Sequence, residues 1–484
     1  MSRLRSSSFG AEGRGGSSNF GAQGAQASAP ALPSEGSSSL LSREQAKALA
    51  ERVLSFSTAD ETRVNITSEW SGNTRFADAN ITTSGGVTDT TVTVTVTIGK
   101  RRASASSNVL DDASLKRTVE LAARLARLSP EDPELMSELG PQTYSSVNAF
   151  IERTADLNAE ERSSAVKRAV DAATAAGKAA GTIFTAGYLE ANARSMAVAT
   201  SSGLFAYHRT TDADFSVTAR TPDGTGSGWA HAGARDWDAI DAAAIGRIAA
   251  QKSVASRNPR AIEPGLYTAV LEPQAVTDLI PLLAGALSAR NADEGRSAFS
   301  KPGGGTRIGE KVVDTRVTLY SDPSDPKLLG RPFDAEGLPV GRVVWIENGI
   351  LKNLSYTRFW AQKQGVQATG ENVLAGGLTL AGGTKRTEEL IAGCERGILV
   401  THFFYIRSLE PRTVLQTGLT RDGAFLIEKG KIARALKNFR WNESPLLMLN
   451  RLEDIGLPEP TAAGRMMPAL RIRDFNFASL SDAV

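Results

Sequence analysis

The sequence predicts an α+β fold of two domains, in which largely antiparallel sheets are flanked by helices. Many segments alternate apolar and polar residues, as strands with one buried face do. These segments follow one another through short Gly-containing turns, so hairpins are expected rather than repeated βαβ units. A few other segments carry apolar residues at helical spacing. The 484 residues suffice for two domains, each with a core of its own.

The first half is predicted to hold a disordered tail at 1–40 and an N-terminal α+β domain at 41–258. The tail is rich in Ser, Gly and Ala and buries too little apolar area to offset its ordering entropy. In chain order, we expect a helix at 41–56, strands at 62–82 and 88–108 with a turn at 84–86, helices at 111–130 and 157–179, a strand meander at 181–235, and a helix at 237–253.

The second half, 259–484, is predicted to be a β-rich C-terminal domain that follows a Pro- and Gly-containing linker at 256–265. Strands are expected within 266–273, 311–322, 341–357, 397–408 and 423–441, and short helices at 357–364, 386–394 and 444–453. Asn348-Gly349 and Lys429-Gly430 are hairpin turns. Residues 278–300 are predicted to form an amphipathic helix, although Pro281 and Gly285 are unfavourable inside one.

The composition indicates a cytoplasmic protein. The net charge is +2 with both signs mixed, so nucleic acid is not an expected partner. No apolar run reaches the roughly 18 residues that a membrane span needs, and the N-terminus shows no secretory signal. A single cysteine, Cys394, excludes an internal disulfide framework.

The candidate chemical groups are few. No phosphate-binding glycine motif has the required spacing. The soft or borderline metal ligands are Cys394 and three histidines, His208, His231 and His402. His208 and His231 lie on neighbouring predicted strands, where a packed or solvent-facing pair is favoured over a metal site. Cys394 and His402 would allow a nucleophilic dyad, but a buried cysteine and a half-buried sheet histidine also explain them.

Several long motifs, in order, resemble the TldD/PmbA family, whose members are known as modulators of DNA gyrase. They are "NTRFADANIT" (73–82), "GRSAFS" (295–300), "GRPFDAEGLP" (330–339), "TRDGAFLIEKGKIARALKNFRW" (420–441) and the terminal "MPALRIRDFNFASLSDAV". The resemblance runs from about residue 44 to 484. It implies a TldD/PmbA-like two-domain architecture and a cytosolic subunit that dimerises around an enclosed peptide cleft.

In the TldD-type subunit of this family, an H-E-x-x-x-H helix and a C-terminal cysteine bind zinc; the PmbA-type (TldE) subunit lacks these ligands. Anchored on "GRSAFS", the three helix positions fall on Ile280, Pro281 and Gly285, none of which can bind or assist zinc. Residues 272–300 contain no histidine, and 461–472 contain no cysteine. The resemblance therefore implies a non-catalytic PmbA/TldE-like subunit with neither metal nor other cofactor.

The expected partners are a TldD-type zinc peptidase subunit, or a second copy of this chain, and an unfolded peptide. Arg296, Ser297 and Phe299, directly after the altered helix, are the predicted peptide contacts; capping and packing of the turn is their alternative role. Two other functions remain open. One is a stand-alone homodimeric peptide-binding protein, and the other is a hydrolase that uses a different site, such as Cys394 with His402.

Overall fold

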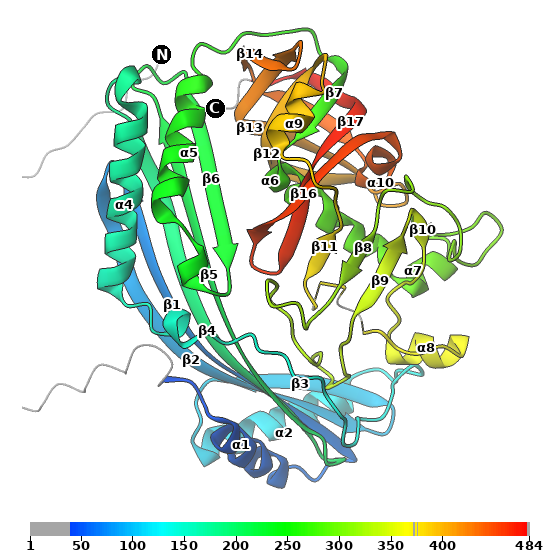
Figure 1. Ribbon diagram of the computed structural model, residues 1–484. Helices are drawn as coiled ribbons and strands as arrows, with labels where there is room; N and C mark the ends of the chain where they lie inside the picture. The colour runs from blue at the N-terminus through cyan, green and yellow to red at the C-terminus, as the bar shows by residue number, and fades with distance from the viewer. Residues whose placement is uncertain (1–38, 371–372, 375, 482–484) are drawn as a thin grey trace, which may run out of the picture. The chain divides into compact units, whose positions relative to one another are not determined.

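Helices and two sheets with mostly antiparallel pairings make up the computed structural model, which describes residues 39–370, 373–374 and 376–481 (Figure 1). The α+β class predicted from the sequence is confirmed. Residues 34–484 form one compact unit. Apart from Ser39 and Leu40, the predicted tail lies outside the described residues. No helix in the described part of the chain is both long enough and apolar enough to cross a membrane.

The N-terminal sheet has six strands in the order β3-β2-β1-β4-β5-β6, and every neighbouring pair is antiparallel. Its strands are β1 Glu61–Ala77, β2 Asn80–Ile98, β3 Arg101–Ser107, β4 Phe184–Thr200, β5 Phe205–Arg220 and β6 Ser227–Ala234. The accompanying helices are α1 Arg43–Ser55, α2 Asp112–Leu128, α3 Glu152–Ala155, α4 Ala159–Gly177, η2 Lys178–Ala180, η3 Trp237–Ala239 and α5 Ala242–Ala255.

The two faces of this sheet differ because strand residues alternate between them. One face carries apolar side chains such as Trp70, Leu189 and Phe215, which pack with residues of α4 and α5 (Figure 1). The opposite face carries polar groups. On it Arg194 links Glu69, at 2.8 Å, to Asp212, at 2.7 Å. The polar face of β5 and β6 contributes to the site described below.

The turn expected at 84–86 is wrong. β2 runs without interruption through these residues, where Gly85 pairs with Asn73 of β1. The chain reverses instead at Asp78-Ala79, both in the left-handed region with φ of 48° and 60°. Two consecutive positive φ angles are the geometry of a type I′ hairpin turn. The hairpin at Asn348-Gly349 and that at Lys429-Gly430 are confirmed as β9–β10 and β13–β14.

The C-terminal sheet has eleven strands, and β7 pairs with both β12 and β17, so that β7, β12, β13, β15 and β17 form a closed ring of pairings. The strands are β7 Gly265–Leu271, β8 Leu319–Ser321, β9 Val343–Glu347, β10 Ile350–Leu351, β11 Leu378–Leu380, β12 Arg396–Glu410, β13 Leu415–Glu428, β14 Lys431–Leu436, β15 Phe439–Glu443, β16 Leu452–Ala462 and β17 Arg465–Leu480. The helices are α6 Pro273–Leu279, η4 Ile280–Leu287, α7 Ala289–Asp293, α8 Arg358–Gln364, α9 Thr387–Ala392, α10 Pro445–Met448 and η5 Leu449–Arg451.

The helix predicted over 278–300 differs from the one observed. An α-helix begins earlier, with Pro273 in its first turn, and ends at Leu279, where a 3₁₀ segment, η4, takes over. Pro281 lies at the start of η4, because its ring and its missing N–H disrupt an α-helical interior. α7 then follows, with Ser288 as its N-cap.

Direct contacts join the polar face of the six-stranded sheet to the C-terminal half. Asn65 Nδ2 donates to the Ala335 carbonyl at 2.8 Å, and His231 Nδ1 lies 3.0 Å from the Thr461 carbonyl. Gly233 of β6 permits a close approach, since a Cβ there would lie 2.8 Å from the Ala463 nitrogen. The domain boundary at 258/259 stays a prediction, because residues 34–484 group as one unit.

Candidate functional site

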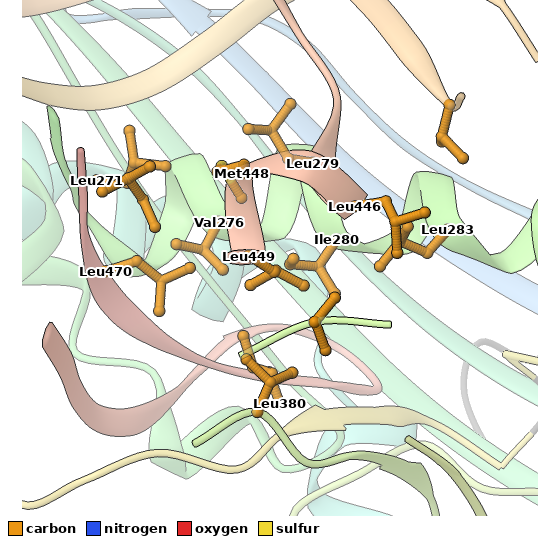
Figure 2. Packing of buried hydrophobic residues seen from close by; sticks show 14 of the residues in the cluster. Leu271, Val276, Leu279, Ile280, Leu283, Leu380, Leu446, Met448, Leu449 and Leu470 are labelled. Atoms are coloured by element: carbon orange, nitrogen blue, oxygen red, sulfur yellow. The ribbon is translucent and has the colours of Figure 1, made fainter. Parts of the chain in front are cut away.

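Ile280, which the resemblance assigns to the position of the first zinc histidine, lies in the hydrophobic core. Ile280 is fully buried. In Figure 2 it lies among Leu380, Leu446 and Leu449, which belong to the same buried cluster. An imidazole placed here would lose its hydration without gaining a polar partner from these leucines. The surroundings of this position therefore do not fit a zinc ion.

The other two positions also lack ligands but have different surroundings. Pro281 is half-buried at the start of η4. Gly285 is exposed, and a Cβ there would meet no atom within 4 Å. Among the described residues, no group of three or more His, Cys, Asp or Glu side chains could hold a metal ion. The three positions at which the resemblance predicts the lost zinc ligands are thus a buried isoleucine, a half-buried proline and an exposed glycine.

A pocket of about 180 Å³ opens beside Gly285, between η4, α7 and α8. A second pocket of about 520 Å³ shares Ser288, Arg290 and Thr357 with it, so the two adjoin. Arg290 crosses this region: its guanidinium donates to Glu134 at 2.6 and 3.1 Å and lies 5.3 Å from the Trp360 ring centre. Together the pockets form a polar groove, lined from both halves of the chain, that starts at the altered zinc positions.

The three predicted peptide contacts have different environments. Phe299 is fully buried in the core, and Ser297 is buried with its hydroxyl donating to the Ala286 carbonyl at 2.5 Å. Ser297 Oγ also accepts from the Phe299 N–H at 3.1 Å, as a residue that closes a turn does. Arg296 is exposed and pairs with Glu294. Ser297 and Phe299 thus make the contacts of the alternative packing role, and peptide contact by these residues stays a prediction.

The structure brings together a polar cluster that the sequence analysis did not identify. Trp229 is stacked between two imidazoles, with ring centres 5.4 Å from His231 and 4.6 Å from His402. His231 Nε2 contacts Asp214 Oδ1 at 2.7 Å. Trp229 and His231 lie on β6, His402 on β12 and Asp214 on β5, so the stack joins the two sheets. The two-residue spacing of Trp229 and His231 predicted a shared strand face, but nothing local indicated β12.

Two further carboxyl groups face the same cluster. Asp278 of α6 accepts from the Phe403 N–H at 2.8 Å and from Gln274 Nε2 at 3.0 Å, and burial raises its pKa to about 6. Asp422 of β13 accepts from the Ser227 hydroxyl and lies 3.7 Å from His402 Nε2. Burial lowers the pKa of His402 to about 4, so this imidazole is neutral at neutral pH.

These groups line a pocket of about 610 Å³. Its walls come from β5 and β6, from α6, and from β12, β13, β16 and β17. The lining residues include Asp214, Trp229, His231, Gln274, Thr277, Asp278, His402, Arg421, Asp422 and Arg465. We call this cavity the histidine–arginine pocket.

The structure does not bring Cys394 and His402 together. Cys394 is buried in a separate apolar cluster with Leu390 and Phe425, and burial raises its pKa. It precedes β12 by two residues, whereas His402 is the seventh residue of that strand. At about 3.3 Å per residue the two lie roughly 20 Å apart. His402 has Asp422 as its neighbour instead, and the Ser227 hydroxyl donates to that carboxylate rather than to an imidazole. The geometry gives the dyad hypothesis no support.

His208 and His231 are not paired either. On β5, His208 lies opposite Met196 of β4, whereas His231 of β6 lies opposite Ser216. His208 Nε2 is 3.3 Å from the Gly330 carbonyl, and burial lowers its pKa to about 4. Each imidazole has contacts of its own, so the two histidines do not form the expected pair.

Comparisons with known proteins identify the family. Residues 64–126, 152–257 and 264–479 match, in order, domain 1, the central domain and the C-terminal domain of the PmbA/TldA metallopeptidases. The fold is similar to that of TldE from Thermococcus kodakarensis, with a TM-score of 0.79 and 19% identity, over 89% of this chain and 99% of that one.

Curated relatives match over shorter stretches. The metalloprotease PmbA homolog of Haemophilus influenzae is 23% identical over 292 residues, which is 59% of this chain and 62% of that protein. An uncharacterized protein of Methanocaldococcus jannaschii is 34% identical over 103 residues, or 21% of this chain and 24% of that protein. This chain thus matches less than two thirds of the length of these relatives. With all three domains matched in order, the chain belongs to the PmbA/TldD family.

Proposed function

We propose that this chain is a non-catalytic PmbA/TldE-like subunit of a TldD/TldE-type metallopeptidase complex. In this role it forms part of a chamber and holds an unfolded peptide, while a TldD-type subunit carries the zinc and hydrolyses the peptide. The observation that carries the proposal is the burial of Ile280 among leucines, at the position of a zinc ligand. A zinc site there would need a change of core packing as well as new ligands.

The groove beside Gly285 supports the peptide-holding part of the proposal. It starts at the altered zinc positions and is lined by polar and charged groups from both halves of the chain. With no side chain at Gly285, a peptide backbone can approach η4 closely. A free-standing hydrolase would need a nucleophile or an activated water in this groove, and the lining residues provide neither a histidine nor a cysteine.

A sheet edge offers a second means of holding an extended chain. β3 pairs with Val92–Ile98 of β2, and no strand among the described residues pairs with the outer side of 80–91. This edge contains no lysine or proline, the residues that commonly protect edges from strand addition. An unfolded peptide can add to such an edge through its backbone, independently of its sequence.

The subunit assignment is tested by co-expressing this chain with the TldD-type subunit of the same genome. We expect a mixed complex, with zinc bound in proportion to the TldD-type subunit, and hydrolysis of an unstructured peptide that a chelator abolishes. This chain purified by itself should contain no stoichiometric zinc and leave the peptide intact.

Three results would count against the proposal. Recovery of homodimers only would favour the stand-alone peptide-binding alternative. Chelator-sensitive cleavage by this chain in isolation would show that it is a peptidase in its own right. Cleavage that a Cys394→Ser variant loses would instead revive the hydrolase alternative.

A further inference from the structure

The acidic groups of the histidine–arginine pocket already have partners. Asp214 contacts His231, Asp422 accepts from Ser227, and Asp278 accepts from two N–H groups. The carboxylates are thus held by the protein itself. A cationic ligand would have to displace these contacts in order to bind here.

The arginines of the pocket are less fully paired than its carboxylates, since Arg421 has only a long ion pair with Asp422. Arg465, at the start of β17, is half-buried and lines the pocket, yet within the described part of the chain its guanidinium has no hydrogen bond or ion pair. Arg421 stacks on the Phe404 ring at 4.1 Å, and its Nε is 3.7 Å from Asp422 Oδ2, beyond hydrogen-bond distance. A guanidinium carries five N–H donors in a planar fork, so both side chains keep donors for a ligand.

This donor set suits a carboxylate. A guanidinium binds a carboxylate with two parallel hydrogen bonds, and such charge-assisted bonds are about twice as strong as neutral ones. The Trp229 ring already stacks with two imidazoles, which leaves less of it for an aromatic or nucleobase ligand. Asp278 can accommodate an anion, since its raised pKa lets it take up a proton and so lose its own negative charge when an anion arrives nearby.

The pocket also lies at a suitable distance from the groove. Asp278 is seven residues before Gly285 along α6 and η4. At 1.5 to 2 Å per residue these two positions are roughly 12 Å apart. About four residues of extended peptide span this distance. A peptide that passes Gly285 would therefore need about four further residues to reach the pocket.

We propose that the histidine–arginine pocket is a subsite for the C-terminal carboxylate of a bound peptide, with Arg465 as its principal ligand and Arg421 as a second donor. The inference rests on the proposed peptide-holding function and adds a substrate class to it: chains that present a free C-terminus. Asp214 and Asp422 fix the two imidazoles around Trp229, which form the wall of the subsite.

The test compares three fluorescently labelled, unstructured Gly/Ser/Ala decapeptides by fluorescence anisotropy on the full chain. One has a free C-terminal carboxylate, one has a C-terminal amide, and one has the amide and an internal glutamate. We expect the free acid to bind about tenfold more tightly than either amide. Arg465→Gln should abolish this preference and Arg465→Lys should retain part of it. Arg434→Gln, the same charge loss at an exposed position on β14, should leave the preference intact.

The outcomes separate this inference from the proposed function. Equal binding of acid and simple amide overturns the carboxylate subsite and leaves peptide holding in place. Equal binding of the acid and the glutamate-containing amide overturns the C-terminal assignment. Failure of all three peptides to bind overturns both peptide holding and the subsite, whereas co-purification with the TldD-type subunit tests the partnership separately. Thermal unfolding shows whether Arg465→Gln is folded. If it is not, the test uses Arg465→Lys, and a preference for the free acid equal to that of the wild type would overturn the role of Arg465.

Discussion

Ile280 and Gly285 lie five residues apart on one 3₁₀ segment, yet they have opposite surroundings. Ile280 is buried in the largest apolar cluster, and Gly285 faces open space beside a pocket. The resemblance assigned both to positions of zinc ligands but gave no reason why each residue stands there. The burial supplies one: the first position stabilises the core, and the second leaves room at the surface.

The first prediction follows from this contrast. Ile280→Ala should lower the free energy of unfolding by about 2–5 kcal/mol, because it removes buried methylene groups and leaves a cavity. The matched change Gly285→Ala should not lower the free energy of unfolding and should raise it by up to about 1 kcal/mol, since the new methyl meets no atom and the unfolded chain loses conformational freedom. Urea unfolding of both variants measures the difference; similar effects of the two changes would contradict the packing seen here.

The protonation of Asp278 makes the free energy of unfolding depend on pH. Burial raises its pKa to about 6, whereas an unfolded aspartate ionises near 4. The folded state therefore holds this proton more tightly, and the contribution of Asp278 to the free energy of unfolding is lost as pH rises from about 4 to above 6. His402 acts in the opposite sense, because its pKa is lowered to about 4 and folding disfavours its charged form. His208, whose pKa burial also lowers to about 4, acts in the same sense as His402. The wild-type pH profile thus combines contributions of opposite sign.

The second prediction isolates one of them. Asp278→Asn removes the carboxyl titration but keeps the His402 contribution. Relative to wild type, the variant should gain free energy of unfolding between pH 4 and pH 7, by up to roughly 3 kcal/mol. Urea titrations at several pH values in this range measure that gain. A difference between the two proteins that does not change with pH would show that Asp278 is not a buried, protonated group.

At the scale of elements, most helices and strands follow from local pattern. α1 begins at its N-cap Ser42, with a capping box to Gln45, and buries Ala46, Leu49 and Val53 as their spacing predicted. The errors occur where local and tertiary preferences disagree. The Gly-rich segment 84–86 favours a turn, yet pairing with β1 continues β2 through it. At Pro281 the α-helix gives way to the 3₁₀ segment η4, while the side chains of Ile280 and Leu283 are buried in the core.

The third prediction concerns the β1–β2 hairpin. Ala79 has a φ of 60°, a conformation that costs a residue with a Cβ about 1 kcal/mol or more. Ala79→Gly should therefore raise the free energy of unfolding by about 1 kcal/mol. Ala105→Gly, inside β3, should lower it by about 0.5–1 kcal/mol because glycine weakens a strand. Guanidinium unfolding of the pair provides the measurement, and destabilisation by Ala79→Gly would place the turn elsewhere.

At the scale of the whole described unit, a few close contacts join the two sheets. His231 reaches the Thr461 carbonyl on β16, and Gly233, two residues later on β6, has no Cβ that would obstruct the β16–β17 turn. The stack of His231, Trp229 and His402 depends on the same approach. The histidine–arginine pocket therefore exists only when the two sheets are in contact.

The fourth prediction tests this junction. A Cβ at Gly233 would lie 2.5 Å from Asp214 Oδ1 and 2.8 Å from the Ala463 nitrogen, both too close. Gly233→Ala should displace the β16–β17 turn, lower the free energy of unfolding by about 1–3 kcal/mol, and speed limited proteolysis near 462–465. Gly285→Ala again serves as the control. Unchanged stability and unchanged cleavage would mean that the sheets do not approach at Gly233.

The sequence by itself determined the α+β class, most strands and helices, and the family; the loss of zinc ligands at 280, 281 and 285 stays a prediction from the family resemblance. These depend on period-2 and period-3.6 patterns, on turn residues and on contiguous motifs, all of which are local along the chain. The tertiary structure decided which groups meet. His231, Asp278, His402 and Arg465 come from distant segments, and strand pairing and sheet contact unite them. It also separated Cys394 from His402, eight residues away in sequence, because an extended strand carries its residues apart instead of gathering them.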